Sequence, residues 1–247
     1  MLTNYRRHIS GSRELREILI ADAVLILAFD MMLNGGIPSS ASSFGAFIYF
    51  LPITAVGVTL SFVLHELMHK FVAQRFGAIA EFVHSRMGIL ITLVTAMFGF
   101  LVGIPGATVI YSNTFTRREN GLVSLAGPLT NFAVFLLFLI VGLLAFPNFS
   151  GNILTTFGYY TKLGYLQNMI NFTLFISILL AFFNMLPIPP LDGSKIFAWN
   201  KPVFAAMIGI IFLLFLTIIP LYSLLGTMVL WLVIAFILSM FYRNIGL

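Results

Sequence analysis

Residues 61–73 of this 247-residue chain read SFVLHELMHKFVA, an apolar run that holds two histidines four positions apart. No glycine or proline interrupts the run, so the sequence predicts a continuous helix. Side chains four positions apart lie on one face of a helix, and His65 and His69 can therefore reach the same metal ion. Glu66 lies one step round the helix from His65, where its carboxylate can stand beside that ion.

The composition indicates that this helix lies in a membrane. Of all residues, 60% are hydrophobic and 9% are charged, whereas soluble domains are about a quarter charged. A chain so poor in charge cannot cover its surface with polar groups, and lipid is its natural solvent. Ionisable residues inside apolar helices are costly and are functional candidates by default. The chain has no cysteine, so any metal must be bound by His, Asp or Glu.

Six apolar stretches approach the length that a membrane-spanning helix needs. They cover residues 18–33, 47–76, 122–146, 166–186, 203–221 and 224–242. We therefore predict an all-α polytopic membrane protein with about six transmembrane helices in a single domain, 1–247. The first stretch carries Asp22 and Asp30 and has no cleavage site in good register, so we expect it to be a retained helix rather than a signal peptide.

The basic residues predict the orientation. All 13 Lys and Arg residues except Lys162 lie at one face of this arrangement, and the positive-inside rule identifies that face as cytoplasmic. Both termini are then cytoplasmic, and the positive charge is a topology signal rather than evidence for nucleic acid. A further apolar stretch, 87–104, has basic flanks on both sides and contains several helix breakers. We predict a re-entrant hairpin or loop that borders the site, with a pair of short crossing helices as the alternative.

Two histidines leave a catalytic zinc ion short of ligands, because such sites use three protein ligands and one open position. Asp192 follows three prolines that end the fourth span and enforce extended backbone, on the same predicted side as His65 and His69. We predict Asp192 as the third ligand; the alternative is a cap for the helix that follows. Zinc lowers the pKa of bound water towards about 7, and Glu66 can then act as general base.

Three motifs follow one another along the chain: HELMH at 65–69, AGPLTN at 126–131 and NMLPIPPLDG at 184–193. With these motifs the chain resembles the site-2 protease family of intramembrane zinc metalloproteases, in a compact form without an inserted PDZ or CBS domain. The resemblance covers about 47–197, which we take as the catalytic core. Met68 and Ser194 stand where many family members have glycine, and neither is a ligand.

The resemblance implies one Zn²⁺ ion held by His65, His69 and Asp192, with Glu66 as catalytic base. It also implies a transmembrane protein or peptide as substrate and a β-hairpin after the HELMH helix whose edge could pair with unwound substrate. Asn184 matches a position that lies close to the substrate in the family, which makes it a candidate binding residue. The expected location is a prokaryotic plasma membrane, with the active site towards the cytoplasmic leaflet.

Other polar residues have ordinary interpretations. We expect Asp22 and Asp30 to be interfacial carboxylates that face water, with a water path to the zinc as the alternative. We expect His84 to lie at the surface, the Gly127-Pro128 pair to start a helix, and Asn131 to bond a neighbouring helix.

Two other functions remain open at this point. A zinc or proton transporter would need ionisable residues across the whole membrane, and residues 47–63 contain none. A different class of membrane metalloprotease would usually bring a glutamate on a helix as third ligand.

Overall fold

The computed structural model describes residues 11–101, 103, 105–112, 115–147, 149 and 164–218. Its elements are α1 (Gly11–Leu33), α2 (Ala41–Val58), the π-helix η1 (Thr59–Val63), α3 (Leu64–Arg75), β1 (Ile79–His84), α4 (Arg86–Met97), β2 (Gly106–Tyr111), α5 (Arg117–Ala145), α6 (Tyr165–Asn184), α7 (Asp192–Trp199) and α8 (Lys201–Ile218).

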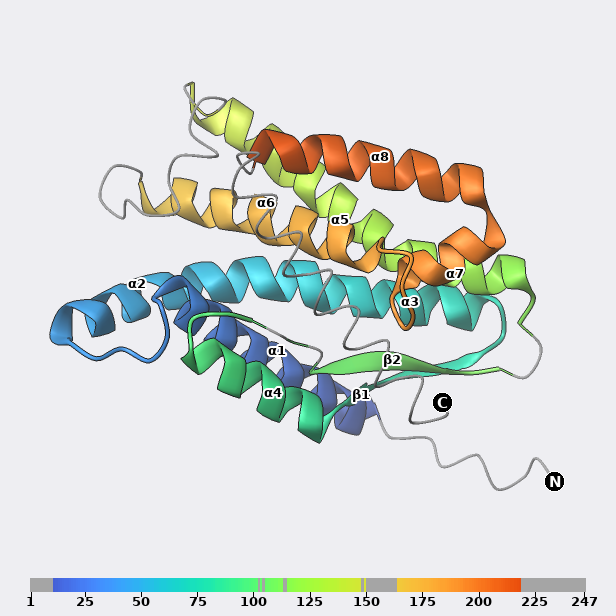
Figure 1. Cartoon of the computed structure of the whole chain (residues 1–247), viewed down its shortest axis with the longest axis horizontal. Helices are drawn as coiled ribbons and strands as arrows, with labels where there is room; N and C mark the ends of the chain where they lie inside the picture. The colour runs from blue at the N-terminus through green and yellow to red at the C-terminus, as the bar shows by residue number, and fades with distance from the viewer. Residues whose placement is uncertain are drawn as a thin grey trace.

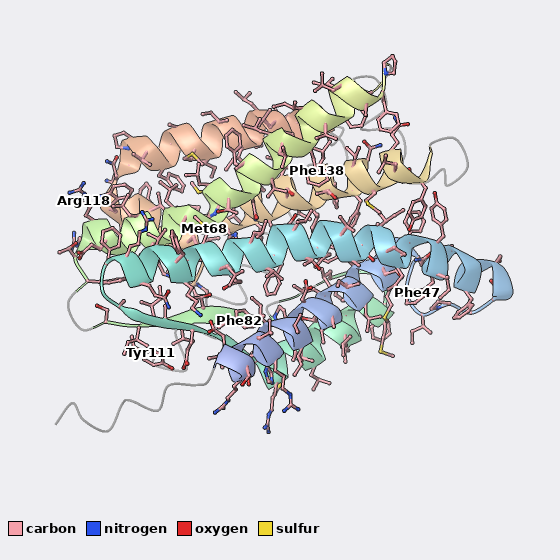
Figure 2. The ribbon with its side chains drawn as sticks, turned by 180° about the vertical axis from the view of Figure 1, so that it is seen from behind. Phe47, Met68, Phe82, Tyr111, Arg118 and Phe138 are labelled. Carbon is pink, nitrogen blue, oxygen red and sulfur yellow. The ribbon has the colours of Figure 1, made fainter. Side chains whose placement is uncertain are left out.

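A long helix made of α2, η1 and α3 runs through the middle of the molecule (Figure 1). On one side of it lie α1, α4 and the two strands, and on the other lie α5, α6, α7 and α8. The packing partners agree, since α3 contacts both strands and α5, while α6 contacts α2, α5 and α8. Figure 2 shows Phe47 towards one end of the long axis and Arg118 at the other. The HELMH helix thus stands between the sheet and α5.

Among the described residues, three helices are long and apolar enough to cross a membrane: Ser42–Arg75, Arg117–Ala145 and Tyr165–Asn184. They match the predicted spans 47–76, 122–146 and 166–186. The predicted span 18–33 lies in α1, a helix that also carries several charged residues and is not among the three. The span 203–221 coincides with α8 as far as Ile218, and 224–242 lies outside the described residues. The count of six spans therefore stays a prediction.

The fold is mostly helical, but the predicted all-α class is wrong in one respect. Strands β1 and β2 form an antiparallel pair in which Ile79 faces Tyr111 and His84 faces Gly106. Both strands are too short, at six residues each, to stand out as alternating patterns in so apolar a chain. They are stable here because they pack on α1 and α3.

The segment between the strands also differs from the expectation. The prediction for 87–104 is a re-entrant hairpin or loop, yet Arg86–Met97 is helix α4, capped by the Ser85 side chain, which accepts a hydrogen bond from Gly88 N–H. The described residues contain one helix here, not the alternative pair. The strands flank this helix, and Ser85 N–H donates to Pro105 O at 2.7 Å. The segment therefore leaves and returns at the same end of the sheet, and its re-entry into the membrane stays a prediction.

The π-helix η1 is held on both sides immediately before the HELMH motif. Thr59 donates a hydrogen bond of 2.7 Å to Asp22 Oδ2 on α1. The hydroxyls of Ser61 and Ser177 on α6 lie 2.7 Å apart. A π turn inserts one residue, which rotates the helix that follows by about 100°. These contacts therefore set the direction in which the side chains of α3 point.

Asp22 and Asp30 do not face water within the protein, contrary to the expectation for both. Asp22 is 5% exposed and Asp30 is fully buried. One carboxylate oxygen of each has no hydrogen-bond partner among the described residues. Because α1 packs against α2, η1, α4 and β1, both carboxylates are enclosed by protein.

Pro128 lies inside a helix instead of starting one, which corrects the expectation for Gly127 and Pro128. Helix α5 begins eleven residues earlier at Arg117, behind a capping box in which Thr116 and Glu119 bond each other's backbone N–H groups. Proline has no N–H to donate to the carbonyl four residues before it, so this turn of α5 lacks one helical hydrogen bond.

Gly57 offers a test of the contact between α2 and α6. A Cβ atom at this position would lie 2.5 Å from Phe172 Cδ1 and 3.4 Å from Ile176 Cγ2. Gly57→Ala is therefore expected to lower the stability by about 1–3 kcal/mol through overpacking, seen as a lower unfolding temperature in detergent. Gly45→Ala on the same helix is the control, since nothing lies within 4 Å of its Cβ position. Equal unfolding temperatures for both variants would contradict the prediction.

Candidate metal centre

Three predicted ligands converge in the structure. His65 Nε2 and His69 Nε2 lie 3.0 Å apart, and Asp192 Oδ2 lies 3.5 Å from the first and 3.1 Å from the second. One ligand atom from each residue lies within 4.8 Å of the others, and all three residues are buried. Two imidazole nitrogens and a carboxylate oxygen this close together require a proton or a metal ion between them. The fold thus brings together the HELMH motif and the motif that contains Asp192, which lie far apart in the sequence.

His69 is held in the tautomer that metal binding needs. Its Nδ1 lies 2.8 Å from the carbonyl oxygen of Val123 on α5. A carbonyl can only accept, so Nδ1 carries the proton and donates it. The lone pair of Nε2 is then free to face His65 and Asp192. A backbone partner of this kind orients metal-binding histidines in many proteins.

His65 has a side-chain partner on α5, the helix that also carries Val123. Asn131 Nδ2 lies 3.1 Å from His65 Nδ1, while Asn131 Oδ1 is buried without a partner among the described residues. The two ends of an amide are exchanged by rotating the group by 180°. With Oδ1 facing His65, Nδ1–H would donate to it, the orphaned oxygen would be satisfied, and His65 Nε2 would be free to bind a metal ion. The orphaned oxygen therefore fits a metal-bound His65.

Asp192 is the first residue of α7, and its carboxylate points to the histidines rather than capping the helix. The N-cap is Leu191, which makes no side-chain cap. The position favours a negative charge because the N-terminus of a helix carries a partial positive charge. Burial alone would raise the pKa of the Asp192 carboxyl, but a proton on His69 Nε2, in the place that a metal ion would take, and hydrogen bonds from both imidazoles outweigh it and hold the pKa well below its usual range. Asp192 is therefore suited to the predicted role of an anionic ligand.

Two glycines let the backbones approach closely enough to build this site. A Cβ on Gly127 would lie 2.4 Å from His69 Nε2 and 2.5 Å from His65 Nε2. A Cβ on Gly193 would lie 2.1 Å from the carbonyl oxygen of Met185, which explains the glycine after Asp192. The first glycine brings α5 against the imidazoles, and the second folds the proline-rich turn onto the end of α6.

Glu66 faces the same space and is bonded to strand β2. Its Oε2 accepts hydrogen bonds of 2.8 Å from both the backbone N–H and the hydroxyl of Thr108. A cavity of about 210 Å³ is lined by His65, Glu66, His69 and Asp192, and its remaining wall is mainly apolar. The predicted base and the predicted ligands therefore share one enclosed space.

Asn184, the candidate binding residue, also lines this cavity. Its amide donates to Leu180 O on its own helix at 3.0 Å. Lys195 is the one basic side chain among the described residues that line the cavity. His84 lies outside it, half-buried and paired with Glu17, so the expectation of a surface histidine holds only in part.

Sequence reasoning missed several residues that shape the site. Gly127 and Asn131 belong to the AGPLTN motif, but their contacts with the histidines could not be read from the motif alone. The Val123 carbonyl and Thr108 have no sequence signal of function, because a backbone acceptor and a strand threonine occur everywhere.

The donor set fits a zinc ion. Catalytic zinc sites use three protein ligands of the nitrogen and oxygen type and leave a fourth position open. Two histidines and one aspartate supply that number. The Val123 carbonyl leaves His69 Nε2 as the metal-facing nitrogen, and Asn131 does the same for His65 when its Oδ1 faces the ring.

The family comparison agrees with this chemistry. The sequence profile of Peptidase family M50 matches residues 53–200, a range that contains all three ligands and Glu66. The chain belongs to peptidase family M50. It is a metalloprotease, and none of the solved structures matches it.

Two relatives of this M50 chain carry names that agree with the assignment. A protein of Methanocaldococcus jannaschii named "Putative zinc metalloprotease MJ0611" is 35% identical over 201 residues, which is 81% of this chain and 91% of the relative. A protein of Bacillus subtilis named "Putative zinc metalloprotease YwhC" is 29% identical over 213 residues, 75% of this chain and 89% of the relative. The predicted family, enzyme class and zinc cofactor are thereby confirmed.

Gly127→Ala tests whether the close approach of α5 is needed. The added methyl group would occupy the space of both Nε2 atoms, so we expect a metal content well below that of the wild type, measured by elemental analysis of the purified protein. Gly209→Ala on α8 is the control, since nothing lies within 4 Å of that Cβ position. Full metal content in the Gly127 variant would contradict the prediction, because it would show that the histidine side chains can move aside and still bind the metal ion.

Proposed function

We propose that this M50 metalloprotease is an intramembrane zinc endopeptidase that hydrolyses peptide bonds in or near transmembrane segments of other proteins. One observation carries the proposal. The ligand atoms of His65, His69 and Asp192 lie within 4.8 Å of one another in a cavity that also holds Glu66. Two of these residues and Glu66 belong to a helix long and apolar enough to cross a membrane. The whole of 1–247 is proposed as one domain with its catalytic core at about 47–197.

Each residue has a defined role in the proposed reaction. His65, His69 and Asp192 hold one zinc ion, which, when bound, polarises the scissile carbonyl and acidifies a water molecule. Glu66 takes a proton from the attacking water while the oxygen of that water bonds to the carbonyl carbon. The carbon–nitrogen bond then breaks, and Glu66 returns the proton to the leaving amine. Asn184, at the cavity wall, is proposed to contact the substrate backbone.

A transmembrane substrate must unwind before this reaction, because its helical backbone shields the peptide bonds. Strand β2 lies next to α3 and is paired with β1 on one side only. Away from Thr108, whose N–H donates to Glu66, its other edge can accept an extended peptide by strand addition. The apolar wall of the cavity suits the side chains of such a substrate.

The orientation of the protein follows from its charges. Lys70 near the end of α3 pairs with Glu14 near the start of α1, and Arg117 and Arg118 begin α5. The HELMH end of the molecule is thus the basic end, which the positive-inside rule assigns to the cytoplasm. We propose a multi-pass protein of a prokaryotic plasma membrane with cytoplasmic termini and the site in the cytoplasmic leaflet; both named relatives come from prokaryotes.

A zinc or proton transporter is the alternative function, and the buried Asp22 and Asp30 are the observations that favour it. Against it, α2 (Ala41–Val58) has no Asp, Glu, His, Lys or Arg, so no chain of ionisable groups continues along that helix. Zinc flux into liposomes that contain the purified protein would distinguish the transporter from the peptidase.

Glu66→Gln tests the role of the base. Gln has nearly the same shape but cannot take the proton, so we expect zinc to remain bound while cleavage falls by at least about a hundredfold. The probe is a library of synthetic peptides with about 20 apolar residues, randomised at four central positions, with products read by mass spectrometry. A wild-type protein that cleaves none of them, or a Gln variant that cleaves as fast, would overturn the proposed reaction.

Two of the three predicted ligands can be tested separately by metal content. His65→Ala and Asp192→Ala each remove one of three protein ligands, and we expect both purified variants to lose most of their zinc. Glu81→Ala, which removes a carboxylate on β1 that bonds Tyr111 instead, should retain it. Equal zinc in wild type and all three variants would rule out this site.

A further inference from the structure

The register of the two strands determines where their free hydrogen-bonding groups point. In an antiparallel pair, residues that exchange backbone hydrogen bonds alternate with residues that do not. Ser85 N–H donates to Pro105 O. Every second pair from there, Val83–Ala107 and then Glu81–Val109, is therefore also of the hydrogen-bonded type. The pair Phe82–Thr108 falls between them. The backbone N–H groups of Phe82 and Thr108 therefore point away from the sheet.

On the β1 side, this outer edge is closed by helix α1. Phe82 N–H donates to Glu14 Oε1 at 3.1 Å, and His84 N–H donates to Glu17 Oε2 at 3.2 Å. These carboxylates occupy the positions that a further strand would use. They also fix the sheet relative to α3, because Glu14 pairs with Lys70.

On the β2 side, the matching contact is made by Glu66. The outward N–H of Thr108 donates to Glu66 Oε2 at 2.8 Å, and the Thr108 hydroxyl lies 2.8 Å from the same oxygen. The hydroxyl also lies 3.1 Å from the backbone carbonyl of Glu66, but its single proton favours the closer, charged acceptor. Glu66 Oε1 makes no hydrogen bond within the described part of the chain. The two oxygens of one carboxylate therefore have different surroundings.

We propose that Thr108 is a positioning residue for the base Glu66: its N–H and hydroxyl hold Oε2, so that Oε1 is the oxygen that takes the proton from water. This rests on the proposed function, and it adds to it a role for strand β2. The glutamate side chain has three rotatable bonds, and without an anchor its carboxylate would sample several orientations. Two hydrogen-bond donors from Thr108, a residue of a rigid strand, restrict the carboxylate to one orientation.

The choice of residue also has a physical reason. Threonine suits a strand because it is branched at Cβ, and its short side chain keeps the hydroxyl beside its own N–H. In a largely apolar cavity, a carboxylate needs donors of this kind in place of water. Serine would supply the same hydroxyl, whereas valine would supply only the shape.

The test compares Thr108→Val with Thr108→Ser in the full-length protein. The probe is the library peptide that the wild type cleaves fastest, and kcat and KM are measured separately. Valine removes one of the two anchoring hydrogen bonds, so we expect kcat to fall about tenfold with little change in KM or zinc content. Serine should restore kcat to within about twofold of the wild type. Thr95→Val on α4, whose hydroxyl bonds Ile91 O in its own helix, is the control and should behave as the wild type.

Three outcomes would count against the positioning role. A valine variant with the kcat of the wild type would show that the hydroxyl does not act on Glu66. A rise in KM with kcat unchanged would assign Thr108 to substrate binding. Loss of zinc in the valine variant, with no rescue by serine, would assign it to the integrity of the site. All three leave the peptidase proposal intact, because that proposal is tested by Glu66→Gln.

Discussion

The close approach of two imidazoles and one carboxylate is the constraint on which the rest of this structure depends. His65 Nε2, His69 Nε2 and Asp192 Oδ2 are buried together in a protein that has little charge to compensate them. Lone pairs and a negative charge at such distances repel one another unless a cation or a proton lies between them. The surrounding elements are arranged to bring these atoms together and to satisfy every other polar atom of the two rings.

Helix α5 supplies most of that support. It contributes the Val123 carbonyl for one imidazole, the Asn131 amide for the other and, at Gly127, the absence of a side chain that would collide with both. All three lie within the turns around Pro128, where one helical hydrogen bond is missing. The AGPLTN motif is therefore explained by its contacts with HELMH, although these contacts cannot be read from the sequence of either motif.

The sheet plays a second part. The family resemblance implies a β-hairpin after the HELMH helix, but the apolar pattern of the sequence does not indicate these strands. Carboxylates bond both outer edges: Glu14 and Glu17 of α1 on the β1 edge, and Glu66 at Thr108 on the β2 edge. The β1 edge is held by a helix that does not take part in the chemistry. The β2 edge is held by the residue proposed as the base, so the strand proposed to receive substrate and the group proposed to cleave it are in direct contact.

The sequence by itself determined the membrane class, the HELMH helix and Asp192 as a candidate ligand. These follow from local properties: hydrophobic content, the four-residue spacing of the histidines and the proline run before Asp192. Charge counting also predicts that 87–104 enters and leaves on one side of the membrane. The hydrogen bond from Ser85 to Pro105 is consistent with this prediction, which remains untested.

Only the tertiary structure decided the rest. The strands at 79–84 and 106–111 are short and are stabilised by packing on α1 and α3, so their own sequences do not specify them. The burial of Asp22 and Asp30 depends on the helices that enclose α1. The contacts of Val123, Asn131 and Thr108 join residues 42–66 positions apart. Such contacts are made by the packing of whole elements, and no local pattern in the chain records them.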